Sequence, residues 1–260
     1  MNETHWNVAA YEAFHDLRLR PALDLLARVP SLTAGDIVDL GCGAGPVAPA
    51  LRSRFPGETL IGVDHSDDML AKAGERALYD ALVQSDITQW RPASPPSLIF
   101  SNAALHWVDG HDVLFPALYS ALRPGGALAI QVPSQIDMPA QCLMRNAAAD
   151  VRPDLFTGWR PFPGHRPTTE YVQMLSGAAT DLWFTEYLQR LTADGSIHPV
   201  RAFTASAAAR PIYAKLEGDD VEAFDRIWEA GLAEAYPISA EGEVWYPFRR
   251  FFLIARKPEA

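Results

Sequence analysis

The chain has 260 residues, of which 48% are hydrophobic and 21% are charged, as is typical of a globular protein that can bury a sizeable core. Its net charge of -10 and its pI near 5.1 argue against a general nucleic-acid binder, which usually presents a basic face. Its two cysteines, Cys42 and Cys142, cannot form a disulfide framework or a CxxC metal site. The sequence contains no apolar run of about 18 residues or more and no secretory pattern at its N-terminus. We therefore expect a cytoplasmic protein that does not enter a membrane.

Helices are the first elements expected. Apolar residues at helical spacing over 11–29 predict helix, and Pro21 favours a break, so that a short helix ends near Arg18 and a longer one begins at Pro21. A β-branched run at 37–40 then predicts a buried strand, and apolar residues over 47–55 predict the helix that follows it.

A glycine-rich stretch, Asp39-Leu40-Gly41-Cys42-Gly43-Ala44-Gly45, lies between this strand and this helix. Glycines at every second position let the backbone turn tightly and approach a ligand that a Cβ atom would hold off. The stretch therefore predicts a cofactor cradle. A dinucleotide motif would need a glycine where Pro46 stands, so the spacing favours a mononucleoside-type ligand, and no lysine follows to make a phosphate-binding P-loop.

Five short apolar runs alternate with helical segments and predict parallel β–α–β units in a doubly wound sheet. These runs are 37–40, 59–64, 82–86, 98–102 and 127–132. Ligands of such sheets lie beyond the carboxyl ends of the strands, where this chain carries Gly41, Asp64, Asp86 and Asn102. After the second run, Ser66 is expected to cap a helix whose first turn is acidic.

The pattern changes after Pro133, where proline, arginine and aromatic residues replace the clean alternation. Thr168 or Thr169 is expected to cap a short helix that ends near residue 176. A longer helix is expected over 224–235, and strands are expected over 181–191 and 248–255. We expect a single domain with four parts, which are an N-terminal helical cap (1–30), a cofactor-binding core (31–133), lid and substrate-side elements (134–245) and a final strand (246–260).

The glycine stretch, followed by Asp64 and Asp86, resembles the class I S-adenosylmethionine-dependent methyltransferases. Further blocks narrow the resemblance to the trans-aconitate methyltransferase family and cover almost the whole chain. They lie at residues 6–7, 11–26, 101–108, 128–133, 181–183, 210–211, 235–237 and 250–255. The resemblance implies an α/β fold with a doubly wound, mostly parallel seven-stranded sheet, an N-terminal helical segment and a helical lid. It also implies S-adenosyl-L-methionine as the cofactor.

The same resemblance implies which residues bind the cofactor. They are Asp39, Gly41, Gly43, Gly45, Asp64, His65, Met69, Asp86, Ile87 and Asn102. By similarity, Asp64 would accept hydrogen bonds from the ribose hydroxyls. Asp86 would border the adenine, as would Met69 unless it merely fills the core. Asp39 would bond the cofactor's ammonium group, directly or through water, and Asn102 would lie near the cofactor's amino-acid part.

The family's reaction, methyl ester formation on a small polycarboxylate, makes modest chemical demands. A carboxylate is already ionised at neutral pH, so no general base is needed, and catalysis rests on in-line placement and removal of water. Arginines grip carboxylates bidentately, although each arginine here could instead form a structural ion pair. We assign His106, Arg250 and Arg18 to catalysis. The residues assigned to the acceptor, expected to be a small anionic molecule, are Trp6, Tyr11, Arg20, His106, Trp107 and Arg210.

His106 departs from the family, which usually carries glutamine before this tryptophan. A histidine can act as a general base near neutral pH, which would suit a hydroxyl or amine of a secondary metabolite, or it can simply keep the polar contact of the amide. Two other classes stay open, an oxidoreductase with a nicotinamide cofactor, which Pro46 disfavours, and a cofactor-binding protein that does not transfer methyl groups. No cluster has metal-ligand spacing, so no metal is expected, and the sequence does not predict the oligomeric state.

Overall fold

The structure is a computed structural model that describes residues 15–160, 162, 166–193, 195, 197–205 and 207–259. Trp6 and Tyr11, assigned above to the acceptor, lie outside these residues, and their assignment stays a prediction. In the part of the chain that is described, no helix is both long enough and apolar enough to cross a bilayer.

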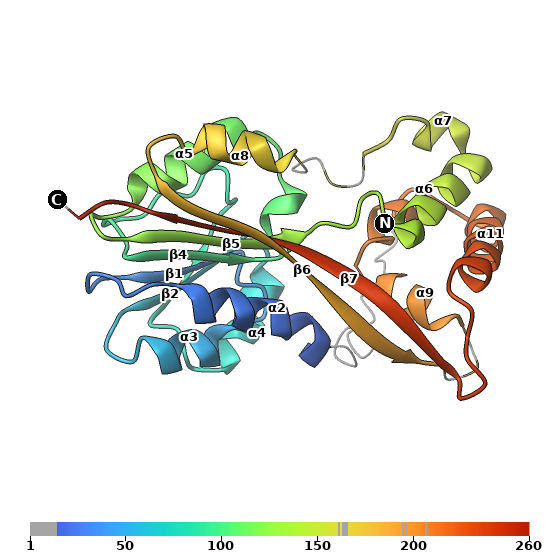
Figure 1. The fold of residues 1–260 in the computed structure, drawn as a ribbon, viewed down its shortest axis with the longest axis horizontal. Helices are drawn as coiled ribbons and strands as arrows, with labels where there is room; N and C mark the ends of the chain where they lie inside the picture. The colour runs from blue at the N-terminus through green and yellow to red at the C-terminus, as the bar shows by residue number, and fades with distance from the viewer. Residues whose placement is uncertain are drawn as a thin grey trace. The chain divides into compact units, whose positions relative to one another are not determined.

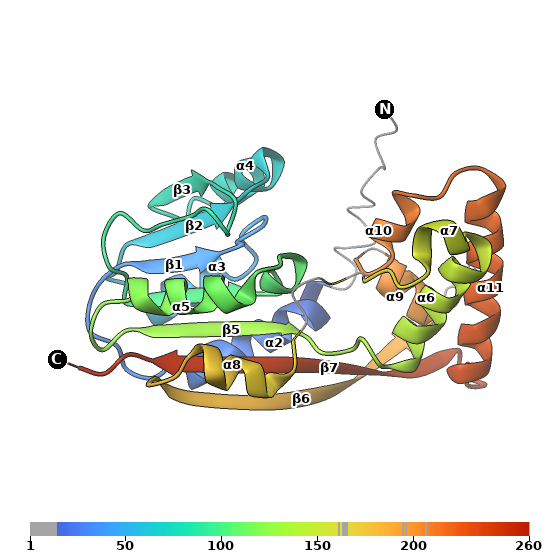
Figure 2. The ribbon, with the colours of Figure 1, turned by 90° about the horizontal axis from the view of Figure 1, so that it is seen from above.

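A seven-stranded sheet carries the fold, in the order β3-β2-β1-β4-β5-β7-β6 (Figure 2). Its strands are β1 (Ile37–Leu40), β2 (Leu60–Asp64), β3 (Ala81–Gln84), β4 (Leu98–Asn102), β5 (Ala127–Pro133), β6 (Ala179–Thr192) and β7 (Glu243–Arg256). The pairs β3·β2, β2·β1, β1·β4 and β4·β5 are parallel, whereas β7 runs antiparallel to β5. The predicted doubly wound, mostly parallel seven-stranded sheet is confirmed.

The central strands are apolar because both of their faces are covered. Every residue of β1 is buried, whereas the edge strand β3 is largely exposed, which explains why its sequence pattern is weaker. The strand order reverses beside β1, with β2 on one side and β4 on the other. This is the topological switch point at which sheets of this kind bind their ligands.

Helices cover both faces of this sheet (Figure 1). On one face lie α2 (His15–Arg28), α3 (Ala48–Arg54) and α4 (Asp67–Glu75), and on the other lie α5 (His111–Ala121) and α8 (Thr168–Met174). Ser66 caps α4 as predicted, because its Oγ accepts a hydrogen bond from the Met69 N–H at 3.4 Å. Asp67 and Asp68 occupy the first turn of α4, where the helix dipole favours negative charge.

The predicted break in the first helix is wrong, because α2 continues through Pro21. Proline removes one backbone hydrogen bond, and the burial of Ala22, Leu25 and Leu26 in the same helix compensates for that loss. The predicted threonine cap of α8 is also wrong. Pro167 occupies the N-cap position and makes no side-chain hydrogen bond there.

Two later elements begin several residues before their predicted starts. The helix α11 (Asp219–Ala235) opens with an acidic first turn, which the dipole favours but which carries no apolar periodicity to predict it. The strand β7 starts at Glu243 and alternates buried and exposed residues at first, with Val244 buried and Trp245 exposed. Its predicted part, from Phe248, is the more continuously buried half.

The chain divides into two compact units. One unit holds Arg18–Pro133, Phe162–Thr185 and Arg250–Ala260, and the other holds Met1–Leu17, Ser134–Pro161 and Glu186–Arg249. In the described part of the second unit, the helices are α6 (Pro139–Val151), α7 (Pro153–Phe156), α9 (Pro199–Ala205), α10 (Arg210–Tyr213) and α11, and α11 packs on α6. The change of unit after Pro133 coincides with the change of sequence pattern, and the division of a single domain into four parts stays a prediction.

Candidate active site

The glycine stretch forms a tight turn directly after β1. Gly41, Gly43 and Gly45 have positive φ angles of 78°, 54° and 72°, which glycine adopts without strain. The turn is tied to β2, because the N–H groups of Gly41 and Cys42 both donate to the carbonyl of Val63, at 2.8 and 3.0 Å. A Cβ atom on Gly43 would meet nothing within 4 Å. The turn therefore leaves open the space that a bound cofactor would fill.

Asp64 lies at the end of β2 and joins this turn to α4. Its Oδ2 accepts a hydrogen bond from the Gly43 N–H at 2.9 Å, and its Oδ1 accepts one from the Ser66 N–H at 3.0 Å. A carboxylate oxygen can accept a further hydrogen bond, so these contacts fix the carboxylate without saturating it. The side chain of the neighbouring His65 is 84% exposed, and its Nδ1 lies 3.4 Å from Asp64 Oδ1.

Asp39, within β1, is buried and faces Tyr79. The Tyr79 hydroxyl donates to Asp39 Oδ2 at 2.7 Å. Burial raises the pKa of Asp39 to about 7, although the hydrogen bond from Tyr79 opposes that rise. The negative charge of Asp64 adds a smaller upward contribution to the same pKa. Asp39 is therefore held near its midpoint of ionisation at neutral pH, and a cation placed beside it would ionise it.

Two side chains between α4 and β3 support the glycine turn. The ring of Tyr79 occupies the space beside Gly45 and Gly62, where added Cβ atoms would lie 2.9 and 3.0 Å from ring carbons. Arg76 donates from Nε to the carbonyl of Ala44 at 2.7 Å. The turn is thus braced by groups more than thirty residues away in the sequence, since Ala44 and Arg76 are 32 positions apart.

The loop after β4 packs against the glycine turn. Ala103 has a positive φ of 54°, which is uncommon for a residue with a side chain, and its N–H donates to the main-chain carbonyl of Gln131 at 2.8 Å. A Cβ atom on Gly41 would clash with the Cβ of Ala104 and lie 3.3 Å from Ile87 Cδ1. Glycine is therefore required at position 41 by packing as well as by backbone conformation.

His106 follows in a 3-10 turn, η1 (Leu105–Trp107), and is buried. Its ring packs against those of Trp107 and Phe162, with centroid distances of 4.7 and 5.4 Å. Burial, then the nearby positive charge of Arg250 and, to a smaller extent, His111 hold the pKa of His106 well below its usual 6.5. The imidazole is therefore neutral at pH 7.

A buried pair of side chains holds η1 in place. Nε2 of His111 lies 2.9 Å from the carbonyl oxygen of Leu105, and its Nδ1 lies 3.0 Å from the Tyr171 hydroxyl. A neutral imidazole carries one N–H and a carbonyl only accepts, so Nε2 donates to Leu105 and Nδ1 accepts from Tyr171. Burial lowers the pKa of His111 and so keeps it in this neutral form. Together α5 and α8 fix the turn that carries His106.

The strand register places four polar side chains on one face of the sheet. They are Asp39 of β1, Asn102 of β4, Gln131 of β5 and Arg250 of β7. Asn102 pairs with Gln131. Asp39 pairs with Phe100, which lies two residues before Asn102, and Arg250 pairs with Pro133, which lies two residues after Gln131. Paired residues share a face, as do residues two apart. Gln131 and Arg250 are 0% and 5% exposed, and Arg250 Nη2 donates to Gln131 Oε1 at 3.4 Å.

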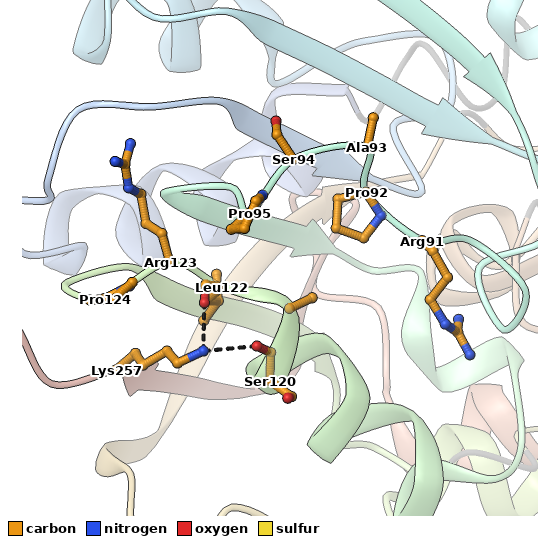
Figure 3. Close-up of a pocket in the computed structure, with 11 residues that line it drawn as sticks. Arg91, Pro92, Ala93, Ser94, Pro95, Ser120, Leu122, Arg123, Pro124 and Lys257 are labelled. Carbon is orange, nitrogen blue, oxygen red and sulfur yellow. Dashed lines mark hydrogen bonds between the residues drawn. The ribbon is translucent and has the colours of Figure 1, made fainter. Parts of the chain in front are cut away.

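A shallow pocket of about 530 Å³ lies at the amino ends of the parallel strands, among the loops that precede β4 and β5 (Figure 3). Lys257 donates from Nζ to two main-chain carbonyls at the end of α5, at 2.8 and 2.6 Å. The guanidinium groups of Arg91 and Arg123 point away from each other (Figure 3), and both donate to main-chain carbonyls. These cations stabilise loops and do not converge on a ligand, so the carboxyl edge of the sheet is the candidate active site.

Comparison with known proteins decides the family. Residues 37–126 match a methyltransferase domain family. A trans-aconitate 2-methyltransferase of Methylobacterium nodulans is 38% identical over 259 residues, which cover 97% of this chain and 98% of that protein. The trans-aconitate 2-methyltransferase of Streptomyces avermitilis is 39% identical over 264 residues, which cover 97% of each. The chain belongs to the trans-aconitate 2-methyltransferase family.

The fold agrees with this family. The solved structure of an S-adenosylmethionine-dependent methyltransferase from Mesorhizobium loti covers 90% of this chain and 96% of its own, with a TM-score of 0.52 and 24% identity. The predicted methyltransferase class and the predicted cofactor, S-adenosyl-L-methionine, are confirmed. The alternative of a nicotinamide-dependent oxidoreductase is wrong.

The residues of this methyltransferase fit the cofactor. The glycine turn leaves open space beside Gly43, and the fixed Asp64 carboxylate retains acceptor capacity for ribose hydroxyls. Asn102 Oδ1 is buried and has no hydrogen-bond partner within the described residues, so it is available to a donor such as an ammonium group. The ligand roles of these residues and of Asp39 stay predictions. Within the described ranges, no three His, Cys, Asp or Glu side chains are grouped to hold a metal ion.

The predicted adenine-side residues lie on the loops around the same edge. Asp86 comes after β3 rather than at its end, and its Oδ1 accepts from the N–H and the hydroxyl of Thr88, both at 2.7 Å. These two hydrogen bonds hold the pKa of Asp86 below its usual range. Ile87 packs beside Gly41, and Met69 is half-buried in the first turn of α4.

The predicted acceptor residues are distributed unevenly. Arg250 is buried near His106, whereas Trp107 is 39% exposed. Arg18 is half-buried on α2 and Arg20 is exposed two residues later. Arg210 is exposed at the start of α10 and belongs to the second unit. The structure brings Arg250 and His106 together, and the roles of all these residues toward the acceptor stay predictions.

Three residues of the site were not predicted, namely Tyr79, Arg76 and Gln131. Tyr79 contacts Asp39 across 40 positions and Arg76 contacts Ala44 across 32, so no local spacing pattern could reveal either pair. Gln131 had a detectable signal. It is a polar residue within the apolar strand at 127–133, and polar residues in fully buried strands need partners.

Proposed function

We propose that this enzyme transfers a methyl group to a carboxylate of trans-aconitate and forms a monomethyl ester. The observation that carries the proposal is the identity of 38% and 39%, over 97% of the chain, to two proteins named trans-aconitate 2-methyltransferase. The position of Arg250 supports it independently. A buried guanidinium on the face that carries the cofactor residues is suited to an anionic acceptor.

Bound S-adenosylmethionine supplies an electrophilic methyl group on a positively charged sulfur. Asp39 would hold the ammonium group, because a buried carboxylate with a pKa of about 7 gains most from a neighbouring cation. Asp64 would hold the ribose hydroxyls, and Asn102 Oδ1 would accept from the amino-acid part. Gly43 would let the backbone approach the ligand without a side chain between them.

The task of the protein toward the acceptor is to bind, aim and desolvate a carboxylate. An ionised carboxylate is already the nucleophile, so no side chain has to remove a proton. Arg250 would hold the anion, and the rings of Trp107 and Phe162 around His106 exclude water from one side. Rate enhancement then comes from holding an oxygen in line for attack, which is worth several powers of ten when the geometry is tight.

His106 is the residue on which the acceptor type depends. Its pKa lies well below 6.5, so it is already neutral and able to accept a proton at pH 7. A flat pH profile of kcat therefore does not show whether His106 acts as a general base, but a substitution does. With a carboxylate acceptor, His106→Gln restores the family's usual residue and should keep kcat within about threefold, whereas a hydroxyl or amine acceptor would lose about 100-fold or more with its general base.

The test is transfer of a radiolabelled methyl group to trans-aconitate by the wild type and by His106→Gln. We expect both proteins to form a product that releases its label as methanol in mild alkali, as a methyl ester does. Label that survives alkali would identify an ether or an N-methyl product. That result, or loss of turnover in His106→Gln with the fold intact by circular dichroism, would contradict carboxyl methylation.

A further inference from the structure

Gln131 is a buried amide with half of its hydrogen-bonding capacity unused. It lies near the carboxyl end of β5, is 0% exposed, and pairs in register with Asn102 of β4. Its Nε2 has no hydrogen-bond partner in the part of the chain that the structure describes. Buried side-chain donors are almost always paired in native proteins, so an unused one inside a binding site indicates a missing ligand.

Arg250 fixes the direction in which that donor points. Arg250 Nη2 donates to Gln131 Oε1 at 3.4 Å. A guanidinium has donors and no acceptor, so the amide oxygen must face Arg250 and the amide NH2 must face away from it. The orientation of the Gln131 amide is therefore set by chemistry, and its unused NH2 group lies on the branch turned away from the Arg250 guanidinium.

Gln131 lies on the part of the sheet that is farther from the glycine turn. The strand order is β1-β4-β5-β7, so Gln131 on β5 lies between Asn102 on β4 and Arg250 on β7, two strands away from the glycine turn that follows β1. The loop that carries His106 is attached to the same residue, because the Ala103 N–H donates to the Gln131 main-chain carbonyl at 2.8 Å.

We propose that Gln131 determines acceptor specificity, its amide NH2 donating to a carboxylate oxygen of the acceptor beside the Arg250 guanidinium. This inference rests on the proposed carboxyl methylation. A carboxylate offers only acceptors and is matched by a neutral donor next to a cation. A carboxylate at position 131 would instead repel an anionic acceptor.

Two substitutions separate these contributions. Gln131→Met keeps the length of the side chain and removes both the donor and the oxygen that accepts from Arg250. Gln131→Glu keeps an oxygen for Arg250 while removing the donor and adding a negative charge. We expect the KM for trans-aconitate to rise about ten- to a hundredfold in Gln131→Met, which is the loss of one hydrogen bond to a charged group. The rise should be larger in Gln131→Glu because like charges repel.

Calorimetry supplies the second readout. Trans-aconitate should bind the enzyme–S-adenosylhomocysteine complex more weakly by the same factor in each variant, while the Kd of S-adenosylhomocysteine itself stays within about threefold. The matched control is Gln135→Met. Gln135 is also buried, but its Nε2 already donates to the Tyr246 hydroxyl and the Pro247 carbonyl, at 2.9 and 3.2 Å, so its loss should lower the melting temperature and leave the KM unchanged.

The outcomes distinguish the inference from the function on which it rests. A wild type that esterifies no carboxylate would overturn both. An active wild type whose KM is unchanged in folded Gln131→Met and Gln131→Glu would overturn the inference alone. Weaker binding of S-adenosylhomocysteine with unaltered binding of trans-aconitate would place the Gln131 amide on the carboxylate of the cofactor, and would equally overturn the assignment to the acceptor.

Discussion

The hydrogen bond between Tyr79 and Asp39 should control the pH dependence of cofactor binding. We expect the cofactor's ammonium to lie beside Asp39 and to favour its ionised form, so that binding lowers the pKa of this carboxyl from about 7 and releases a proton around and below that pH. Affinity of the wild type should therefore rise as the pH increases through about 7. Tyr79→Phe removes the hydroxyl that donates to Asp39 at 2.7 Å but keeps the ring that supports the glycine turn.

The magnitude follows from the value of that hydrogen bond. A hydrogen bond to a charged group contributes about 1.5–3 kcal/mol, which is roughly a ten- to hundredfold change in the ionisation constant of Asp39. At pH 7 the ionised fraction should fall from about one half to about 1–10%. If only the ionised form binds, the apparent Kd at pH 7 rises about 5- to 50-fold in Tyr79→Phe. At pH 9 the two proteins should differ by less than about threefold in the milder case, because most of Asp39 is then ionised in both.

Titration calorimetry with S-adenosylhomocysteine at pH 6, 7, 8 and 9 measures this effect, and two buffers with different ionisation heats count the released proton. Tyr119→Phe is the control. It removes a half-buried hydroxyl that donates to the Arg256 carbonyl at 3.3 Å, 137 positions away in the sequence. This variant should leave the Kd unchanged. An unaltered Kd in Tyr79→Phe at pH 7, or a wild-type Kd that is constant from pH 6 to 8, would refute the reasoning.

The raised pKa of Asp39 also makes the stability of the protein depend on pH. The pKa of Asp39 is raised from 3.8 to about 7 in the folded, cofactor-free protein, so between those values the folded state binds the proton that the unfolded state has released. The contribution of Asp39 to stability is therefore greatest at low pH and is lost as the pH rises toward 7. The increase in melting temperature caused by the cofactor should accordingly be larger at pH 8 than at pH 5.

Two further predictions concern the turn and the loop beside it. Gly43→Ala should cost about 1–2 kcal/mol of stability, because its φ is positive but the added Cβ meets no atom, and calorimetry should show that it no longer binds the cofactor. Gly41→Ala should destabilise the protein more, since its Cβ would also clash with Ala104. Equal denaturation midpoints for the two variants would contradict this. Tyr171→Phe should cost about 1 kcal/mol in urea denaturation and lower kcat several-fold with an unchanged Kd for S-adenosylhomocysteine, because it frees His111 and loosens η1; an unchanged kcat would show that η1 does not depend on this pair.

The sequence allowed the cofactor half to be predicted because its signals are local. The run at 37–40, the glycines after it and the Ser66 cap each lie within a few residues of the structure they specify, and β1 and α4 were found where predicted. The central strands are buried on both faces, so their continuous apolar composition identifies them as strands of a parallel sheet. The fold and the cofactor could therefore be argued from short segments.

The acceptor half could not be predicted to the same depth, because its groups meet only after folding. Gln131 and Arg250 are 119 positions apart. Within the cofactor half, the contact between Tyr79 and Asp39, which are 40 positions apart, was missed for the same reason. The continuation of α2 through Pro21 was missed for a related reason, since burial of one helix face decided the outcome against local propensity. Whether Arg18, Arg20 and Arg210 reach the acceptor depends on such long-range placement.

The loop after β4 has a consequence for how this enzyme can acquire new substrates. The Ala103 N–H donates a hydrogen bond to the Gln131 main-chain carbonyl, and the Ala104 methyl group occupies space that a side chain at position 41 would need. A larger residue at position 104 would press against the glycine turn, so we expect that enlarging or reshaping this loop weakens binding of the methyl donor. If residues 106, 131 and 250 bind the acceptor as proposed, adaptation to bulkier acids should change these positions and keep a small residue at position 104.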